Sequence, residues 1–455
     1  MFDTVKELEL HKEYFFEVFY REGDSGYAAT LHLTPELIKF KVTSERDFSL
    51  SWDATEARCD DHRNVFFLKG LYCVVIKSSV INHTPYVGLK EIEFTVESVI
   101  FCPSEPPENG FFESIDIASS TVNEWVGYTT TQQNIFEASY KREDVEPLLV
   151  EFSTPANEHD EIGVRYNATF RQSHLLYEHG FTFPPSLFYL MGSGERVADP
   201  FLIYVRIFNL LAFLTGAEPS VQSVTLNYDL YGYSQKGYLY CINNSLKPKG
   251  SDVYAMFPLG KDPRFDDWGI APFPMSSFAL YFSPDSDLPD LLEKYVKYRS
   301  MGNVEDRLLG YFRLLEKHCY NRKYYLPEDL FVRFSRLAKG WVKANSSLSA
   351  KQIKSFEGGL KRFNGQKYNT EKCLSDFLSS LPEPIKKGLG VTKDLLTEIC
   401  TLRNNITHAN KYNIEEDKLH LFAAHVHHLL IFAILEKLGV VLADVANITN
   451  RLRSY

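Results

Sequence analysis

The sequence predicts an α+β chain of two domains: an N-terminal antiparallel, β-rich and sandwich-like domain with one apolar helix, and a C-terminal all-α helical bundle. Three observations support this fold class. The chain has 455 residues, which exceeds one ordinary domain. Short aromatic and β-branched runs separated by turns fill its first part, and apolar residues at helical spacing fill its last part. We therefore expect domains at residues 1–280 and 281–455.

Predicted strands dominate the first domain. Runs rich in Phe, Tyr, Val and Ile lie at 14–20, 37–42, 64–77, 91–101, 223–233, 237–242 and 252–257. In one of them, Ile92, Phe94 and Val96 alternate with polar residues, which is the period of a strand with one buried face. Turn-rich stretches separate the runs, and this arrangement predicts antiparallel sheets.

Helices are predicted in two places. An almost wholly apolar segment at 199–215 forms a helix that ends before Gly216. After a connector at 262–290, one apolar stripe follows at spacings of four, three and four residues, and it consists of Leu308, Phe312, Leu315 and Cys319. Pro327 suits the first turn of a helix that extends to about Lys343. Further helices are predicted at 349–360, 370–380, 392–404 and 415–438.

Charge and cysteine usage indicate the compartment and the kind of partner. The chain has a net charge of −10, but residues 301–455 carry 24 Lys and Arg against 16 Asp and Glu, whereas residues 1–300 carry 25 against 43. A basic half of this kind favours a polyanion partner. The seven cysteines include no CxxC pair, and no secretory signal is visible. The apolar run at 201–214 is too short to span a membrane. We expect a cytoplasmic protein without a membrane partner.

One segment carries residue types suited to cleaving a phosphodiester. Arg403, Asn404 and His408 lie at the end of one predicted helix and before the last one. An imidazole can move protons near neutral pH, and a guanidinium can hold a phosphate and its developing charge. Asn404 and His408 share a helix face, so the amide can fix the imidazole, whereas Arg403 lies about 140° away from His408. The alternative is a capped helix end with a surface arginine.

The same Arg-x4-His spacing occurs a second time, at Arg313 and His318. This copy lies inside a regular amphipathic helix, so we interpret its residues as structural. Signatures of other enzyme classes, such as GxxxxGK[ST], GxSxG and HExxH, are missing from the sequence.

A basic tract is the second candidate for binding RNA. Residues 333–372 contain ten Lys and Arg against two Glu, with Trp341, Phe356 and Phe363 interleaved. The candidate RNA-binding residues are Arg336, Lys339, Lys343, Lys351, Lys354, Lys361 and Arg362, which would hold phosphates without reading sequence. The alternative is a solvated helix surface with aromatic residues in the core.

Four histidines close together in the last helix, His420, His425, His427 and His428, are a candidate metal cluster. No cysteine or closely spaced carboxylate completes a ligand set there. We expect solvated or interface histidines, and neither a metal nor another cofactor.

The segment LRNNITHA at 402–409, before a long closing helix, resembles the HEPN ribonuclease superfamily. The motif of that superfamily is R-x4–6-H with a polar residue, often Asn, directly after the Arg. Arg403, Asn404 and His408 fit it position by position. The helix at 307–321 is similar to the first helix of ApeA-like HEPN domains, with Leu315 and Glu316 at its core.

The first domain is similar to the β-rich N-terminal domain of ApeA proteins. The similarity rests on its strand-rich start, on the exposed segment with Trp125 and on the apolar helix that begins at Phe201. The resemblance thus covers most of the chain, but it is specific only at Arg403–His408.

The resemblance implies a bacterial anti-phage abortive-infection factor that cleaves RNA, with tRNA as the candidate target, without a metal and as a homodimer through its helical domain. It implies that His408 assists proton transfer at the ribose 2′-OH and that Arg403 stabilises the phosphorane. Glu316 is a candidate support for this site, or a structural ion-pair partner. The final helix, 415–438, would lie partly in the dimer interface, and a phage-derived trigger would bind the domain at 1–280.

A non-catalytic protein is the rival interpretation. In it, a degenerate HEPN domain holds RNA or a partner while the β-rich domain binds a ligand. The intact set of Arg403, Asn404 and His408 favours the enzyme, because a binding module has no need of the histidine.

Overall fold

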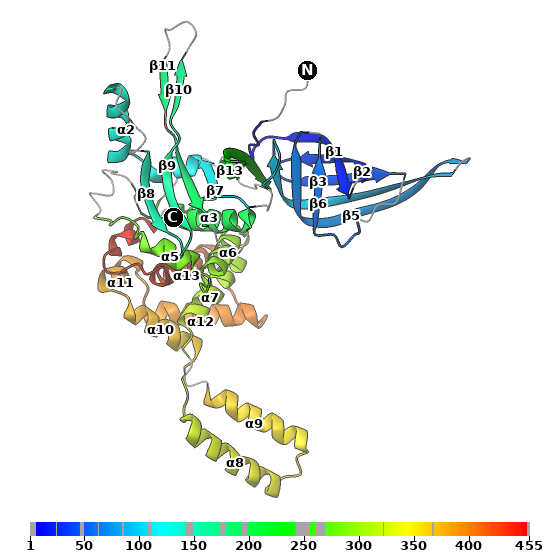
Figure 1. Ribbon diagram of the computed structural model, residues 1–455. Helices are drawn as coiled ribbons and strands as arrows, with labels where there is room; N and C mark the ends of the chain where they lie inside the picture. Colours follow the sequence, from blue (N-terminus) through cyan, green and yellow to red (C-terminus); the bar gives the residue numbers. More distant parts are fainter. Residues whose placement is uncertain are drawn as a thin grey trace. The chain divides into compact units, whose positions relative to one another are not determined.

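The protein consists of two compact units in a computed structural model (Figure 1), one ending at Leu292 and the next beginning at Glu293. The structure describes residues 6–23, 25–45, 50–61, 63–83, 86–107, 111–141, 149–172, 179–192, 199–242, 255–257, 259, 269–321, 323–365 and 368–452. The β-rich region with its apolar helix and the helical C-terminal region are both confirmed.

Six antiparallel strands of the first unit form a closed barrel. They are β1 (Tyr14–Glu22), β2 (Ser25–Leu33), β3 (Ile38–Ser44), β4 (Glu56–Asp60), β5 (Val65–His83) and β6 (Tyr86–Cys102). The ring closes because β3 pairs with β6 as well as with β2. Alternating side chains point inward, and Leu31, Phe40 and Phe94 are fully buried there. The expected sandwich is therefore corrected to a barrel: one sheet curls on itself, and this closure covers the apolar face.

The sheet continues beyond the barrel through β14 (Tyr233–Cys241), which pairs with β6. The next strands in spatial order are β13 (Val221–Leu230), β7 (Ser114–Ser119), β12 (Pro185–Leu190), β9 (Glu161–Tyr166) and β8 (Val150–Pro155). Two further strands, β10 (Thr169–Gln172) and β11 (His179–Thr182), form a separate hairpin. Of the strand expected at 252–257, residues 252–254 lie outside the described residues.

The apolar helix of this unit is α3 (Pro200–Thr215). The Asp199 carboxylate caps its start by accepting from the backbone N–H of Phe201 at 2.9 Å, and Gly216 ends it with a left-handed φ of 67°. Among the described residues of this unit, three more helices were not expected: α1 (Ser120–Val126), α2 (Thr130–Lys141) and α5 (Ser276–Phe282). The last of these lies within the segment that we interpreted as a connector.

The second unit is helical. Its elements are α6 (Leu288–Arg299, which crosses the division), α7 (Val304–Cys319), α8 (Glu328–Asn345), α9 (Ala350–Asn364), α10 (Thr370–Ser380), α11 (Glu383–Leu389), α12 (Lys393–Thr407), α13 (Glu416–Lys437) and a 3-10 helix at Ala446–Asn450. α7 packs along α13, and α10 packs on both α7 and α12. Leu308, Phe312 and Leu315 are buried on the predicted stripe of α7.

α13 is the central helix of this unit. Among the described residues it is the one helix whose length and composition would allow it to cross a membrane. However, 67% of its most apolar stretch is buried inside the protein, as in the core helix of a bundle.

Candidate active site

The three residues of the Arg-x4-His motif lie at the C-terminal end of α12. Thr392 caps the start of this helix with its hydroxyl group. The helix ends one residue before His408, whose backbone N–H donates to the Asn404 carbonyl at 3.0 Å. Ala409 then turns the chain with a φ of 52°. His408 is exposed at this helix end, where its imidazole can reach a bound molecule.

Arg403 is held by residues from two other helices. Its Nη2 donates to Oε2 of Glu316 on α7 at 2.7 Å, and Oε1 of the same carboxylate accepts from the Thr370 hydroxyl on α10 at 2.5 Å. The guanidinium carbon lies 5.2 Å from the ring centroid of Phe312. The Arg403 and Glu316 side chains are 23% and 26% exposed, so the pair is partly shielded from water. The guanidinium is thereby oriented but remains accessible.

The Asn404 amide has a different partner from the one we expected. Its Oδ1 accepts from Nη1 of Arg403 at 3.0 Å. In the part of the chain that the structure describes, no residue hydrogen-bonds the His408 ring. The structure therefore brings the side chains of Arg403, Asn404 and Glu316 together, and it places His408 on the same helix end, where the described residues form no hydrogen bond to its ring.

Sequence reasoning missed two neighbours of Arg403. Thr370 bonds the carboxylate that holds the guanidinium, and Phe312 lies beneath it. We had assigned Phe312 only to the core stripe of α7. No local signal marks either residue, because both contacts join segments that are distant in the sequence.

Cys400 lies one turn before Arg403 and is a candidate nucleophile. Burial raises the pKa of its thiol to about 12, with a further rise from Glu371 and an opposing effect of Arg403. The thiol therefore stays protonated and poorly reactive near neutral pH. The Arg403 guanidinium and the His408 imidazole are the candidate chemical groups at this helix end.

The second Arg-x4-His pair occupies a different environment. Arg313 is exposed, whereas the His318 ring packs edge-on against Phe377 and its Nε2 lies 3.3 Å from Oε2 of Glu436. His318 also lines an open pocket of about 220 Å³ beside Cys319 and other residues of α7 and α10. The ring belongs to the contact between helices, which favours the structural interpretation of this pair.

The candidate RNA-binding residues lie on two helices that pack on each other, α8 and α9. All seven are exposed: Arg336, Lys339, Lys343, Lys351, Lys354, Lys361 and Arg362. Lys339 also pairs with Glu357 across the two helices at 2.9 Å. At about 100° per residue, these side chains lie on one side of the hairpin, which we call the basic face. Lys367 of the same tract lies outside the described residues.

The aromatic residues of this tract are not in the core. Trp341, Phe356 and Phe363 are 68%, 40% and 62% exposed. The alternative placed these aromatic residues in the core, and that part of it is therefore wrong.

The four histidines of α13 have separate surroundings. His420 is exposed, His425 is half-buried, and His427 is buried against Tyr295 and Tyr311. Nε2 of His428 donates to the backbone carbonyl of Leu452 at 3.0 Å. Among the described residues, no group of three or more His, Cys, Asp or Glu side chains could hold a metal ion.

Comparison with known protein families shows that residues 309–443 match the family model Apea-like HEPN. The matched segment begins within α7 and ends just after α13, so it contains Glu316, Arg403, Asn404 and His408. Neither the curated proteins nor the solved structures gave a match to the chain. This chain therefore carries an Apea-like HEPN domain, formed by residues 309–443.

Proposed function

We propose that this protein is a metal-independent endoribonuclease that acts as a cytoplasmic anti-phage effector. HEPN domains are generally ribonucleases. The observation that supports the activity here is Arg403, held by Glu316 at the end of α12 in the matched domain, with His408 exposed on the same helix end. We further propose tRNA as the substrate, abortive infection as the outcome and a phage component as the trigger at the β-rich unit.

The proposed reaction uses the ribose 2′-OH as nucleophile. His408 accepts its proton while the 2′ oxygen forms a bond to phosphorus, and Arg403 stabilises the charge of the phosphorane. The bond from phosphorus to the 5′ oxygen breaks, that oxygen takes a proton from water, and the protonated His408 returns its proton to the solvent. The products carry a 2′,3′-cyclic phosphate and a 5′-OH. DNA lacks the nucleophile and should not be cut.

The test uses the purified full chain with total RNA in EDTA, followed by mapping of new 5′-OH ends. We expect cleavage with chelator present, and enrichment of the ends in tRNA. A short single-stranded RNA serves as a second substrate, because magnesium can act indirectly by folding a larger RNA. Loss of cleavage in EDTA with rescue by one divalent ion would instead indicate a metal-dependent nuclease.

The rival function is RNA binding without cleavage, and one contact favours it. The Arg403 guanidinium is already engaged by Glu316 and Asn404, as a structural arginine would be. The same experiment separates the two functions. A binding module retains RNA but produces no new ends.

Glu316 should act as a positioning residue for Arg403. The Glu316→Gln variant keeps an acceptor for Thr370 but removes the charge that orients the guanidinium. We expect kcat to fall roughly 10- to 100-fold with KM little changed, because a small displacement of a charged group costs this much. Single-turnover cleavage of a short RNA measures the effect.

A matched control exists in another carboxylate that bonds α12. Glu371 of α10 accepts from the Thr397 hydroxyl on α12 at 2.7 Å, but the structure gives it no contact with Arg403. Glu371→Gln should therefore leave kcat close to that of the native chain. An unchanged or increased kcat in Glu316→Gln would mean that the pair is structural or restrains Arg403.

The basic face should bind the RNA backbone without reading its sequence. Changing Lys351, Lys354 and Lys361 to Gln should weaken binding similarly for all RNA sequences. The slope of log affinity against log salt should become shallower by roughly 2 for single strands, because fewer counterions are released. Fluorescence anisotropy over a salt series measures both effects, and the cleavage sites should stay the same.

The control for this triple variant removes three positive charges elsewhere in the helical unit. Lys294, Lys297 and Lys387 are exposed and lie outside α8 and α9. Their change to Gln should alter the slope much less. An equal change in both triple variants would assign the effect to net charge alone.

A further inference from the structure

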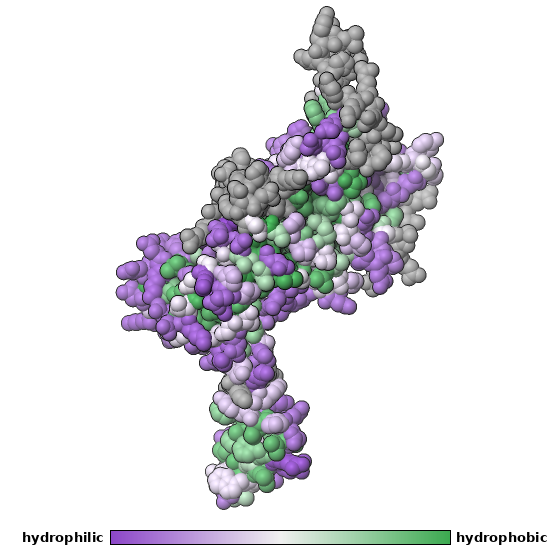
Figure 2. Space-filling model, turned by 90° about the vertical axis from the view of Figure 1, so that its left-hand side faces the viewer, coloured by the Kyte–Doolittle hydropathy of each residue, from purple (hydrophilic) through white to green (hydrophobic). Residues whose placement is uncertain are grey.

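The α8–α9 hairpin exposes a large apolar surface. Its members, which we call the apolar face, are Leu330, Phe334, Leu337 and Trp341 of α8, and Phe356 and Phe363 of α9. Their exposed fractions are 47%, 47%, 73%, 68%, 40% and 62%. Figure 2 shows the hydrophobic colouring gathered over this hairpin.

The six side chains lie on one side of the hairpin. The members in α8 follow at spacings of four, three and four residues, which makes one stripe about 120° around the helix from the buried Ser335 and Val342. In α9, Phe356 and Phe363 are seven residues apart and lie roughly 75° from the buried Ile353. In both helices, the apolar stripe is rotated in the same direction from the buried residues, counted along the chain, and the two helices run antiparallel. The two stripes therefore flank the contact between the helices on the same side.

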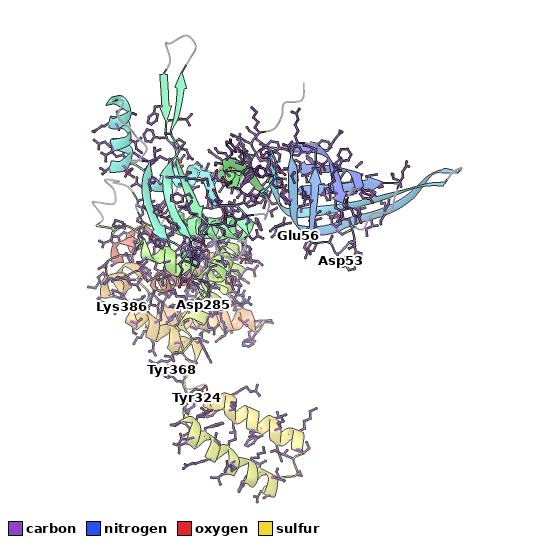
Figure 3. The ribbon with its side chains drawn as sticks, in the orientation of Figure 1. Asp53, Glu56, Asp285, Tyr324, Tyr368 and Lys386 are labelled. Carbon is purple, nitrogen blue, oxygen red and sulfur yellow. The ribbon has the colours of Figure 1, made fainter. Side chains whose placement is uncertain are left out.

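Packing within the hairpin uses this face at its base, where the Phe363 ring stacks on Tyr325 with ring centroids 5.3 Å apart. The base closes through Asn364, which donates to the Leu326 carbonyl at 3.1 Å and accepts from the Leu326 N–H at 2.8 Å. Tyr324 and Tyr368 lie at the two chain ends of the hairpin (Figure 3). Ser349 forms a capping box at the start of α9. The hairpin thus completes its own turns, and the apolar face remains outward.

The size of the face matches one side of a protein interface. Its side chains expose on the order of 700 Å² in total, given that an aromatic side chain carries roughly 150–250 Å². A standard interface buries about 800 Å² on each partner. The largest apolar patch of a typical monomer covers about 300–600 Å². The apolar face is therefore larger than surface scatter and close to what a stable dimer needs.

We propose that two copies of this chain associate through the apolar face, so that their α8–α9 hairpins pack into a four-helix bundle. The spacing of four, three and four in α8 is the spacing that such bundles bury. The face contains no charged side chain, so two identical copies can meet without burying a charge. The two basic faces then point outward on opposite sides. An anionic partner would bind the basic face and not the apolar face. We therefore assign the apolar face to a second copy of the chain.

This inference does not depend on RNA cleavage, because its test measures mass. Sedimentation equilibrium of the full chain should give twice the mass of one chain. The double variant Leu337→Glu, Trp341→Glu should raise the dissociation constant at least about 100-fold, because each copy would bury two unpaired carboxylates. Both side chains are exposed in a single chain, so circular dichroism should show unchanged folding.

Two single variants are the controls. Val332 lies on the other side of α8 and is 49% exposed, so Val332→Glu should keep the dimer. Leu421 is 50% exposed on α13, the helix that the sequence suggested for the interface. Loss of the dimer in Leu421→Glu, but not in the double variant, would overturn the inference. A native chain that stays monomeric would also overturn it and assign the face to a contact within the chain.

A crosslinking measurement gives a second readout. Leu337 lies near the middle of the apolar face, so a bis-maleimide should join two chains that carry Leu337→Cys. Val332→Cys reports the background from the seven native cysteines. Equal crosslinking of the two variants would contradict the proposed contact.

Discussion

Replacing His408 with alanine is expected to lower the rate of RNA cleavage by roughly 10²- to 10⁴-fold, because the 2′-OH loses the group that accepts its proton. Arg403→Ala should lower the rate by roughly 10²- to 10³-fold through lost stabilisation of the phosphorane. His408 is exposed and Arg403 is partly exposed, so neither change should unfold the chain. Single-turnover cleavage in EDTA measures the rates, and thermal unfolding checks the fold.

The second Arg-x4-His pair supplies the matched control. Arg313→Ala and His318→Gln should retain most of the activity, because these side chains lie on α7 and His318 packs against Phe377. Full activity in His408→Ala would remove the proposed site. Loss of cleavage in Arg313→Ala with an unaffected His408→Ala would transfer the site to α7.

Helix positions in this protein could be predicted well from the sequence because their signals are local. Asp199 and Gly216 mark both ends of α3, and the observed helix lies between them. The predicted helix at 415–438 differs from α13 by one residue at each end. Caps and apolar spacing depend on residues within one or two turns, so one sequence contains the needed information.

The closure of the barrel could not be predicted in the same way. Alternation in the run from Ile92 to Val96 shows which side chains face inward, but it does not name the partner strand. β6 pairs with β5, which precedes it in the chain, and also with β3. The second pairing joins strands that are distant in the sequence, and it turns an open sheet into a ring.

Residue patterns predicted the candidate site only along the chain, and Glu316 became a candidate through the family resemblance. Arg403, Asn404 and His408 follow each other within one motif, and the family match contains them. The carboxylate of Glu316 reaches Arg403 from 87 residues away, through the packing of helices. Likewise, periodicity predicted amphipathic helices at α8 and α9, but it could not tell that Trp341 is exposed. Periodicity identifies an apolar face and leaves open what covers it.

Two histidines of α13 should make the stability of the helical unit depend on pH. His427 lies buried between Tyr295 and Tyr311, with its Nε2 2.8 Å from the Tyr295 hydroxyl oxygen. Burial lowers the pKa of His427 well below its usual range, and His428, Arg299 and Arg307 lower it further. Burial also lowers the pKa of His428 to about 4, although its bond to the Leu452 carbonyl opposes the shift. Both rings are therefore neutral in the folded protein near pH 7.

The helical unit should lose roughly 3 kcal/mol of stability or more between pH 7 and pH 4 through these rings. In the unfolded chain a histidine takes up its proton near pH 6.5. The folded chain does so only near the lowered pKa, so stability is present above about pH 6.5 and is lost as the pH falls below it. One pKa unit corresponds to about 1.4 kcal/mol, which gives the figure for His428 alone.

The variant His428→Gln tests this dependence, because its amide can still donate to the Leu452 carbonyl but does not titrate. Its loss of stability on acidification should be smaller than that of the native chain by roughly 3 kcal/mol. His420→Gln is the control, since the His420 side chain lies on the same helix and is 51% exposed. Urea unfolding at each pH, followed by a deuterium pulse that reports α13 amides, isolates the helical unit from the β-rich one. Equal acid sensitivity of native chain and His428→Gln would contradict the assignment and place the titrating groups elsewhere, among the carboxylates.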